Sequence, residues 1–220
     1  MVPPVVRAEH LRKTYDGATD VLRDVNLEVA RGETVLIVGR NGSGKTTLLN
    51  LLGGMDVPTA GHVELNGRDL TRLSETELAR VRLHEVGFVF QTHNLIEDLT
   101  VRQNVALPLR LARKPESGRV DELLRAFDLA GLASRRPEEI SVGQSQRVAV
   151  ARALANGPSM ILADEPMAAL DDAGRAAVAD AFSRAVRDFG VALLLAAVDR
   201  SEWEGPARTL MLRGGVLVGA

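Results

Sequence analysis

The first third of the chain alternates short apolar segments with polar turns, and this pattern predicts β-strands. Strands are expected over residues 5–15, 25–30 and 34–39. The third of these is almost entirely apolar, which is typical of a strand at the centre of a parallel sheet. Residues 45–54 follow the pattern of a helix closed by glycines, and residues 62–67 that of a strand entering a turn.

Between residues 100 and 156 the apolar positions recur at helical spacing, and Ser117 is expected to cap one of these helices. The last part of the chain returns to alternating elements. A strand, a helix, a second strand and a closing hairpin with Gly-Gly at its turn are predicted over residues 159–164, 173–190, 191–198 and 209–219.

Strands that alternate with helices, interrupted by one helical block, predict an α/β fold with a parallel sheet. The 220 residues are most simply one domain. Its core is expected over residues 1–90 and 156–220, with a helical subdomain inserted over residues 91–155.

Composition narrows the class of protein. With 45% hydrophobic and 25% charged residues, the chain has ordinary globular composition, and its net charge of −2 gives no basic surface for nucleic acid. The Pro-Pro pair and charges near the start do not fit a secretory signal, and the longest apolar runs are far shorter than the roughly 18 to 20 residues that cross a bilayer. The absence of cysteine excludes disulfides and fits a cytoplasmic protein.

One glycine-rich segment, GRNGSGKTT, carries the strongest chemical signal. It matches the phosphate-loop pattern G-x-x-x-x-G-K-[ST] and lies between a predicted strand and a predicted helix, as that motif requires. The alternative is a glycine-rich turn without a ligand. The residues expected to surround the phosphates are Gly39, Arg40, Asn41, Gly42, Ser43, Gly44, Lys45, Thr46 and Thr47.

The chemistry of this loop follows from its residue types. Gly42 and Gly44 let successive backbone N–H groups point at an anion, and the following helix adds its positive N-terminal end. Lys45 is expected to reach the β- and γ-phosphates, and the Thr46 hydroxyl to bind Mg²⁺. These features predict a nucleotide site.

A second candidate is the apolar strand that ends in adjacent carboxylates. Asp164 is expected to hold Mg²⁺, and Glu165 to orient or deprotonate the attacking water. Taken alone, Asp-Glu-Pro after a strand more often marks the turn into a helix. Together with a phosphate loop, it indicates a site for hydrolysis.

Residues 138–166, EEISVGQSQRVAVARALANGPSMILADEP, resemble the nucleotide-binding domain of ABC transporters. The signature L-S-G-G-Q of that family corresponds to Ile140-Ser141-Val142-Gly143-Gln144, and the resemblance extends over essentially the whole chain. It implies a P-loop NTPase core with an N-terminal antiparallel β subdomain, and ATP and Mg²⁺ as cofactors. The segment GFVFQTHNLIEDLTVRQNVALPLRL is most similar to the subfamily of lipoprotein release, macrolide export and the cell-division ABC complex.

The resemblance assigns roles to further residues. Gln91 corresponds to the glutamine that contacts the metal and the attacking water, Asp171 to the D-loop aspartate, and Tyr15 to the aromatic residue that stacks on adenine. Without the resemblance, Gln91 is best interpreted as a surface glutamine after a strand. For Tyr15, the alternative is a strand residue that packs locally.

The resemblance also implies partners. Ser141-x-x-Gln144 is a capping-box pattern, so Ser141, Gly143 and Gln144 form a positive helix end that closes on ATP held by a second ABC ATPase subunit. A membrane permease is expected to contact residues 91–110, which would place the protein on the inner face of the cell membrane.

Several residues depart from the family pattern. Val142 replaces a signature glycine, a change that we expect to be tolerated because valine supplies the same backbone N–H. Met167 and Ala168 replace the polar or small pair that precedes the D-loop. Trp203 has no predicted role beyond anchoring its loop.

The most consequential departure is Val198, which stands where the family has a histidine that donates to the γ-phosphate. Asp199 matches the aspartate that follows that histidine, and the last histidine of this chain is His93. Removing one preorganised donor costs on the order of 10² to 10³ in rate. Two functions are therefore favoured: an ATP-hydrolysing transporter subunit, and an ATP-binding regulatory or structural subunit that turns over slowly or not at all. A heterodimer with a subunit that carries the histidine would combine them. A non-transport ABC protein is a third, less favoured alternative, because that class usually carries two such domains in one chain.

Overall fold

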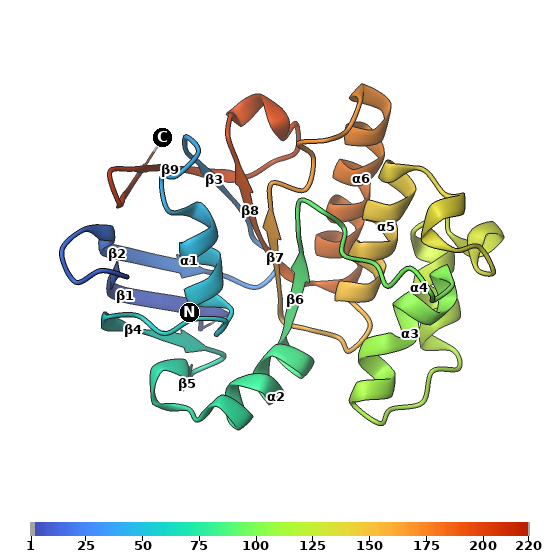
Figure 1. Cartoon of the computed structure of the whole chain (residues 1–220), viewed down its shortest axis with the longest axis horizontal. Helices are drawn as coiled ribbons and strands as arrows, with labels where there is room; N and C mark the ends of the chain where they lie inside the picture. The colour runs from blue at the N-terminus through green and yellow to red at the C-terminus, as the bar shows by residue number, and fades with distance from the viewer. Residues whose placement is uncertain (1–2, 220) are drawn as a thin grey trace.

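The computed structural model describes residues 3–219 and contains two sheets. The smaller sheet is antiparallel, with the strand order β2-β1-β4-β5. Its strands are β1 (Val6–Thr14), β2 (Asp20–Val29), β4 (Ala60–Leu65) and β5 (Arg68–Asp69). Figure 1 shows these strands gathered at one end of the molecule.

The larger sheet has the order β10-β9-β3-β8-β7-β6, and all its pairings are parallel except that of β10 with β9. Its strands are β3 (Thr34–Val38), β6 (Val86–Val89), β7 (Met160–Asp164), β8 (Ala192–Ala197), β9 (Arg208–Arg213) and β10 (Val216–Gly219). The parallel order brings the carboxyl ends of β3, β7 and β8 to one edge.

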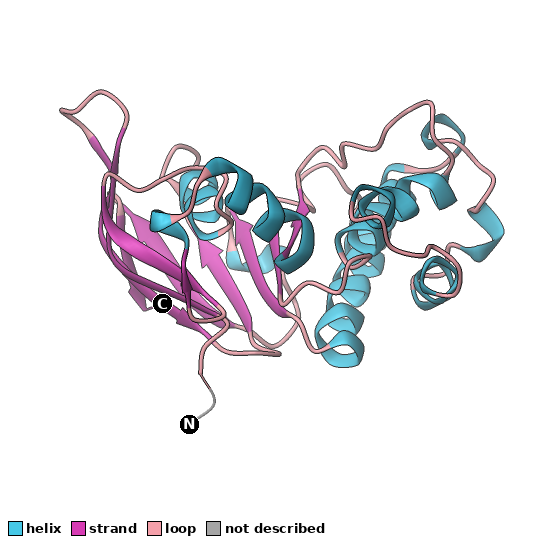
Figure 2. Ribbon diagram, turned by 90° about the horizontal axis from the view of Figure 1, so that it is seen from below, coloured by secondary structure: helices cyan, strands magenta, loops and turns pink. Residues whose placement is uncertain are grey.

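Within residues 3–219, six α-helices pack around the sheets. They are α1 (Lys45–Leu52), α2 (Glu75–Glu85), α3 (Val101–Leu111), α4 (Arg119–Ala126), α5 (Val142–Ala153) and α6 (Asp172–Phe189). Helices α3 and α4 lie at the end opposite the antiparallel strands, and α5 and α6 lie between them and the large sheet (Figure 1). Figure 2 shows the strands on one side of the molecule and this group of helices on the other.

Strand β8 is buried along its whole length, which explains its continuous apolar sequence. Leu193 and Leu195 pack with the residues of α5 and α6, whereas Leu194 packs on the opposite face with α1 and the antiparallel strands. Two hydrophobic cores therefore meet at this strand, one on each side of the large sheet.

The fold class expected from the sequence is confirmed: a parallel core carries an antiparallel β sheet and a group of added helices. The apolar strand β3 does lie inside the large sheet, between β9 and β8. The closing hairpin turns at Gly214 and Gly215, whose φ values of 56° and 78° suit a tight hairpin turn. No helix within residues 3–219 combines the length and apolar character needed to cross a bilayer.

Two details differ from the prediction. Ser117 does not cap α4, because the N-cap is Gly118 with φ 84°, a backbone angle that favours glycine. Helix α2 was not predicted, although Ser74 and Glu77 form the capping box that opens it.

Candidate functional site

The segment between β3 and α1 is a compact loop. Gly42 and Gly44 have φ values of 77° and 103°, in the left-handed region that glycine adopts readily. A Cβ atom on Gly39 would lie 2.5 Å from Ser43 Oγ and 2.7 Å from the Leu212 carbonyl oxygen. The N-cap of α1 is Gly44, which has no side chain to occupy the first N–H groups of the helix. Such an end is suited to binding an anion.

Lys45 lies inside this loop with only 4% of its surface exposed. Its Nζ donates to the Gly39 carbonyl oxygen at 2.7 Å and lies 3.0 Å from Glu165 Oε1. The lysine of the phosphate loop and the glutamate after β7 are therefore direct neighbours, although the sequence separates them widely.

Thr46 and Asp164 form the second connection between α1 and β7. The Thr46 hydroxyl donates to Asp164 Oδ2 at 2.7 Å, while the buried Oδ1 atom has no hydrogen-bond partner within residues 3–219. Burial raises the pKa of Asp164; the Thr46 hydrogen bond opposes this shift and the charge of Glu165 adds to it. A buried carboxylate with a spare oxygen beside a hydroxyl suits a divalent cation.

The donor set is small, which limits the kind of metal site. Residues 3–219 contain no group of three or more His, Cys, Asp or Glu side chains placed to hold a metal ion. Mg²⁺ is commonly bound through one or two carboxylates together with substrate phosphates and water. Thr46 and Asp164 fit this type of site.

Glu165 has a strained backbone. Its φ is 46°, and its N–H donates to the Ala196 carbonyl oxygen on β8 at 3.0 Å. A residue other than glycine in the left-handed region costs on the order of 1 to 3 kcal/mol, and such residues concentrate at functional sites. The contact with β8 holds the carboxylate next to Lys45.

A cavity of 430 Å³ joins most of the residues singled out from the sequence. It is lined by Tyr15, Val21, Asn41, Gly42, Gly44, Lys45, Thr46, Thr47, Gln91, Asp164 and Glu165. Val21, on β2, had no signal in the sequence. Gly39, Arg40 and Ser43 belong to the loop but do not line the cavity. The cavity brings the phosphate loop, both carboxylates and the two family-assigned residues Tyr15 and Gln91 together.

The signature residues lie in a different cavity, of 550 Å³. Ser141 caps α5: its Oγ accepts from the Gln144 N–H, and Gln144 Oε1 accepts from the Ser141 N–H at 2.8 Å. Gly143 and Asp171 line the same cavity, and Asp171 caps α6 through the Gly174 N–H. Within one chain, the signature and the phosphate loop thus line separate cavities.

Val198 follows the last residue of β8 and is 41% exposed. It lies at the edge of the sheet where Asp164 pairs with Ala196. The N–H groups of Val198 and Asp199 donate to Glu202 Oε1 at 2.9 and 3.0 Å. The valine side chain offers no donor, and the two backbone donors are already engaged.

The other departures have simple surroundings. Val142 is 48% exposed at the start of α5, while Met167 is buried in the core beside α5 and α6. Trp203 is buried and packs edge to face on Phe182 of α6, so it does anchor its loop as expected. The Ala168 N–H donates to the Glu165 carbonyl oxygen at 3.3 Å.

Two residues that the sequence did not single out hold the segment around Gln91. Gln146 Nε2 donates to the Gln91 carbonyl oxygen at 2.9 Å, and Arg152 donates to the carbonyl oxygens of His93 and Asn94 at 2.8 and 2.7 Å. Both lie on α5. Their long-range contacts depend on how α5 packs against β6, which no local pattern encodes.

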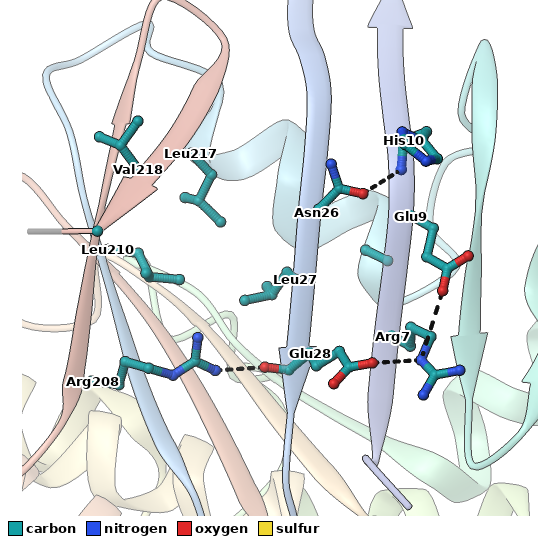
Figure 3. A pocket seen from close by; sticks show the side chains of 12 residues that line it. Arg7, Glu9, His10, Asn26, Leu27, Glu28, Arg208, Leu210, Leu217 and Val218 are labelled. Atoms are coloured by element: carbon teal, nitrogen blue, oxygen red, sulfur yellow. Dashed lines mark hydrogen bonds and ion pairs between the residues drawn. The ribbon is translucent and has the colours of Figure 1, made fainter.

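A larger concavity of 660 Å³ lies on the outer side of the antiparallel sheet, facing the β9–β10 hairpin (Figure 3). Within it, Arg7 is paired with two carboxylates, at 2.7 Å from Glu28 and 3.8 Å from Glu9. Arg208 donates to the Glu28 carbonyl oxygen. None of the predicted site residues lines this concavity, so the smaller cavity at the phosphate loop is the candidate site.

Comparison with known proteins agrees with this geometry. Residues 22–168 match the family model described as ABC transporter. The chain is 44% identical, over 72% of its length and 68% of the relative's, to the lipoprotein-releasing system ATP-binding protein LolD of Xylella fastidiosa.

Two solved structures have the same fold. The ATP-binding cassette MJ0796, a dimer bound to ADP and Pi, is 36% identical with a TM-score of 0.85, and 96% of each chain is covered. CbiO1 from Clostridium perfringens, part of the ABC transporter complex CbiONQ, is 25% identical with a TM-score of 0.88 and covers 98% of this chain and 87% of its own. The chain therefore belongs to the ABC transporter family and is an ATPase of that family.

Proposed function

We propose that this chain is the ATP-binding subunit of an ABC transporter, that it binds Mg-ATP in the cavity at the phosphate loop, and that it hydrolyses ATP slowly. The observation that carries the proposal is the convergence of Lys45, Thr46, Asp164 and Glu165 in one cavity. These are a phosphate-binding cation, two oxygen ligands for a metal, and a base. They meet although the sequence places Lys45 and Thr46 on α1, and Asp164 and Glu165 at the end of β7 and directly after it.

Each of these residues has a part in the proposed chemistry. Thr46 and Asp164 hold Mg²⁺, which neutralises phosphate charge when it is bound. Lys45 contacts the β- and γ-phosphates. Glu165 accepts a proton from the attacking water, and Gln91 orients that water and contacts the metal. Tyr15 stacks on the adenine, which suits a ring that is 65% exposed at the rim of the cavity.

We infer slow hydrolysis from Val198, the residue that follows β8. A donor aimed at the γ-phosphate stabilises the charge that develops in the transition state. Val198 has no such donor, and Glu202 already occupies the N–H groups of Val198 and Asp199. A regulatory ATP-binding subunit, or the degenerate half of a heterodimer, is the alternative that this same observation favours.

The separation of the two cavities supports a dimer. Ser141, Gly143 and Gln144 line a cavity that the phosphate loop does not share, so these residues are free to face ATP bound to a second subunit. The positive end of α5 would approach the γ-phosphate across the interface. The dimeric structures of the cassette MJ0796 support this arrangement.

A groove beside β6 is the proposed contact for a membrane permease. It has a volume of 180 Å³ and lies between β6, α3 and the end of α5, next to residues 91–110. Phe88, Leu107 and Leu111 line it, and Leu111 is 65% exposed. An apolar groove of this kind suits a short helix of the partner. Through that partner, the protein would lie at the inner face of the membrane. The similarity to the lipoprotein-releasing relative favours the subfamily of lipoprotein release, macrolide export and the cell-division ABC complex.

The test is an ATPase assay of purified wild-type protein and Val198→His, with and without the copurified membrane partner. We expect wild type to bind Mg-ATP but to turn over slowly, and Val198→His to increase the rate on the order of 10²-fold. Val198→Ala is the matched control, since it shortens the side chain without adding a donor, and its rate should stay at the wild-type level.

A second variant separates hydrolysis from binding. Glu165→Gln should abolish the remaining turnover in every background while Mg-ATP binding persists. A wild-type rate typical of the family that Glu165→Gln abolishes would contradict slow hydrolysis. If Val198→His gives no gain, the missing donor does not limit turnover.

A further inference from the structure

Lys13, on β1, is a buried lysine with 8% of its surface exposed. Lysine is among the residues least often buried, and a buried ammonium requires partners. Its Nζ donates to Asp56 Oδ1 at 2.7 Å and to the Val57 carbonyl oxygen at 2.8 Å. Both partners lie in the segment that follows α1. Lys13 therefore fastens β1 to the chain directly after the phosphate-loop helix.

Tyr15 lies two residues further along and shares both of these groups. Its ring centroid is 4.8 Å from Lys13 Nζ, and its hydroxyl donates to Asp56 Oδ2 at 3.1 Å. The two oxygens of Asp56 thus divide between the lysine and the tyrosine. A contact at the hydroxyl and a cation over one ring face restrain both side-chain torsions of Tyr15.

The charge of Asp56 suits this arrangement. Burial acts to raise the pKa of Asp56, but hydrogen bonds from Lys13, the Val57 N–H and Tyr15 outweigh it and hold the pKa below its ordinary value. Asp56 is therefore ionised at neutral pH and accepts all three hydrogen bonds.

We propose that Lys13 and Asp56 are positioning residues that hold the Tyr15 ring at the rim of the nucleotide cavity, ready to stack on the base of ATP. This inference rests on the proposed function of Tyr15 as the adenine contact. A ring that is already held loses less conformational freedom when the base stacks on it. Because Asp56 follows α1, the same contacts fix the distance between the base and the phosphate loop.

The test compares two ligands that share the phosphates but differ in the base. Mg-ATP and the Mg²⁺ complex of inorganic tripolyphosphate are titrated by calorimetry into wild type, Tyr15→Phe and Lys13→Met. Tyr15→Phe deletes only the hydroxyl bond to Asp56, and Lys13→Met keeps the length of the side chain but removes the cation. We expect ATP affinity to fall about three- to tenfold in each variant. Tripolyphosphate affinity should change less than about twofold, since the phosphate contacts are untouched.

Two controls complete the set. Arg7→Met removes a cation from the same strand. Because Arg7 pairs with Glu28, which is remote from Tyr15, the affinities for ATP and for tripolyphosphate should both stay unchanged. Tyr15→Ala should lower ATP affinity more than either variant. If Lys13→Met fails to fold, Tyr15→Phe decides the question alone, because the ring is exposed and the change is small.

The outcomes distinguish the positioning role of Lys13 and Asp56 from the adenine contact of Tyr15. Equal losses for both ligands would show that Lys13 and Asp56 merely support the fold, and unchanged ATP affinity would show that they do not position the ring; either result overturns the inference. An unchanged ATP affinity in Tyr15→Ala would overturn the adenine contact itself. A loss in Tyr15→Ala without a loss in Tyr15→Phe and Lys13→Met would overturn the positioning role alone.

Discussion

The hydroxyl of Thr46, on the first turn of α1, donates a 2.7 Å hydrogen bond to Oδ2 of Asp164, the last residue of β7, across 118 residues of sequence. This bond leaves Oδ1 of Asp164 buried without a partner in the described part of the chain. The pair combines two oxygen ligands of different origin at the edge of the parallel sheet. Its role as a metal site leads to the first two predictions.

The first prediction concerns metal binding. Thr46→Val and Asp164→Asn should each lower the Mg²⁺-dependent part of ATP affinity by about tenfold or more, since even residues behind a ligand contribute about 10- to 100-fold. Calorimetric titration with ATP in the presence of Mg²⁺ and in EDTA measures the Mg²⁺-dependent and the Mg²⁺-independent parts of the affinity. Thr209→Val, which removes a hydroxyl on β9 outside this cavity, is the matched control. An equal loss of ATP affinity in EDTA would show that Asp164 supports the fold and does not bind the metal.

The second prediction concerns pH. Burial raises the pKa of Asp164, so Mg²⁺ affinity should fall as the pH is lowered through this raised value, and Asp164→Asn should remove that dependence. In the unfolded chain this group ionises at its ordinary pKa of 3.8. The folded state therefore loses stability as the pH rises from 3.8 through the raised pKa, and the whole cost is present above it.

The same shift predicts a change in thermal stability. Without Mg²⁺ at neutral pH, Asp164→Asn should melt at a higher temperature than wild type, because it carries no buried charge. The difference should close as the pH approaches 3.8. Scanning calorimetry in EDTA at several pH values measures this, and a lower melting temperature for the variant at neutral pH would count against the assignment.

The third prediction concerns the segment around Gln91. Arg152 donates to the carbonyl oxygens of His93 and Asn94, and hydrogen bonds from charged groups contribute about 1.5 to 3 kcal/mol each. Arg152→Met should therefore accelerate amide hydrogen exchange over residues 91–95 while exchange in β7 stays slow. Arg125→Met, an exposed arginine on α4, serves as control. Unchanged exchange near Gln91 would show that the Arg152 hydrogen bonds do not order the segment.

The fourth prediction concerns Trp203, which is 1% exposed and packs on Phe182 with ring centroids 6.5 Å apart. Trp203→Ala should lower the free energy of unfolding by about 3 to 5 kcal/mol, because it leaves a cavity beside α6. Trp203→Phe should lose less, since it keeps part of the ring contact. Urea denaturation followed by circular dichroism measures both, and a loss below about 1 kcal/mol for the alanine variant would contradict the anchoring role.

Local patterns carried much of the fold. The motif between β3 and α1, the capping box at Ser141 and the Gly214-Gly215 turn were predictable because each depends on residues within a few positions. Ser117 shows the limit of such patterns. A serine before a helical stretch satisfies the capping preference, but the positive φ of Gly118 moves the helix start.

The site itself depends on contacts between distant elements. The meeting of Lys45 with Glu165, or of Tyr15 with Asp56, requires the strand order of the large sheet and the packing of α1 between the two sheets. Sheet order and helix packing are settled by burial of apolar faces over the whole chain, so no local window encodes them.

Val198 shows what the sequence and the tertiary structure each determine at a single residue. The sequence alone determined that no histidine stands there, because the covalent chain fixes which side chain follows β8. Only the tertiary structure decided that Glu202 binds the N–H groups of Val198 and Asp199, because that depends on how the chain turns after the strand. The valine side chain therefore offers no donor, and the fold pairs the two neighbouring backbone N–H groups with Glu202.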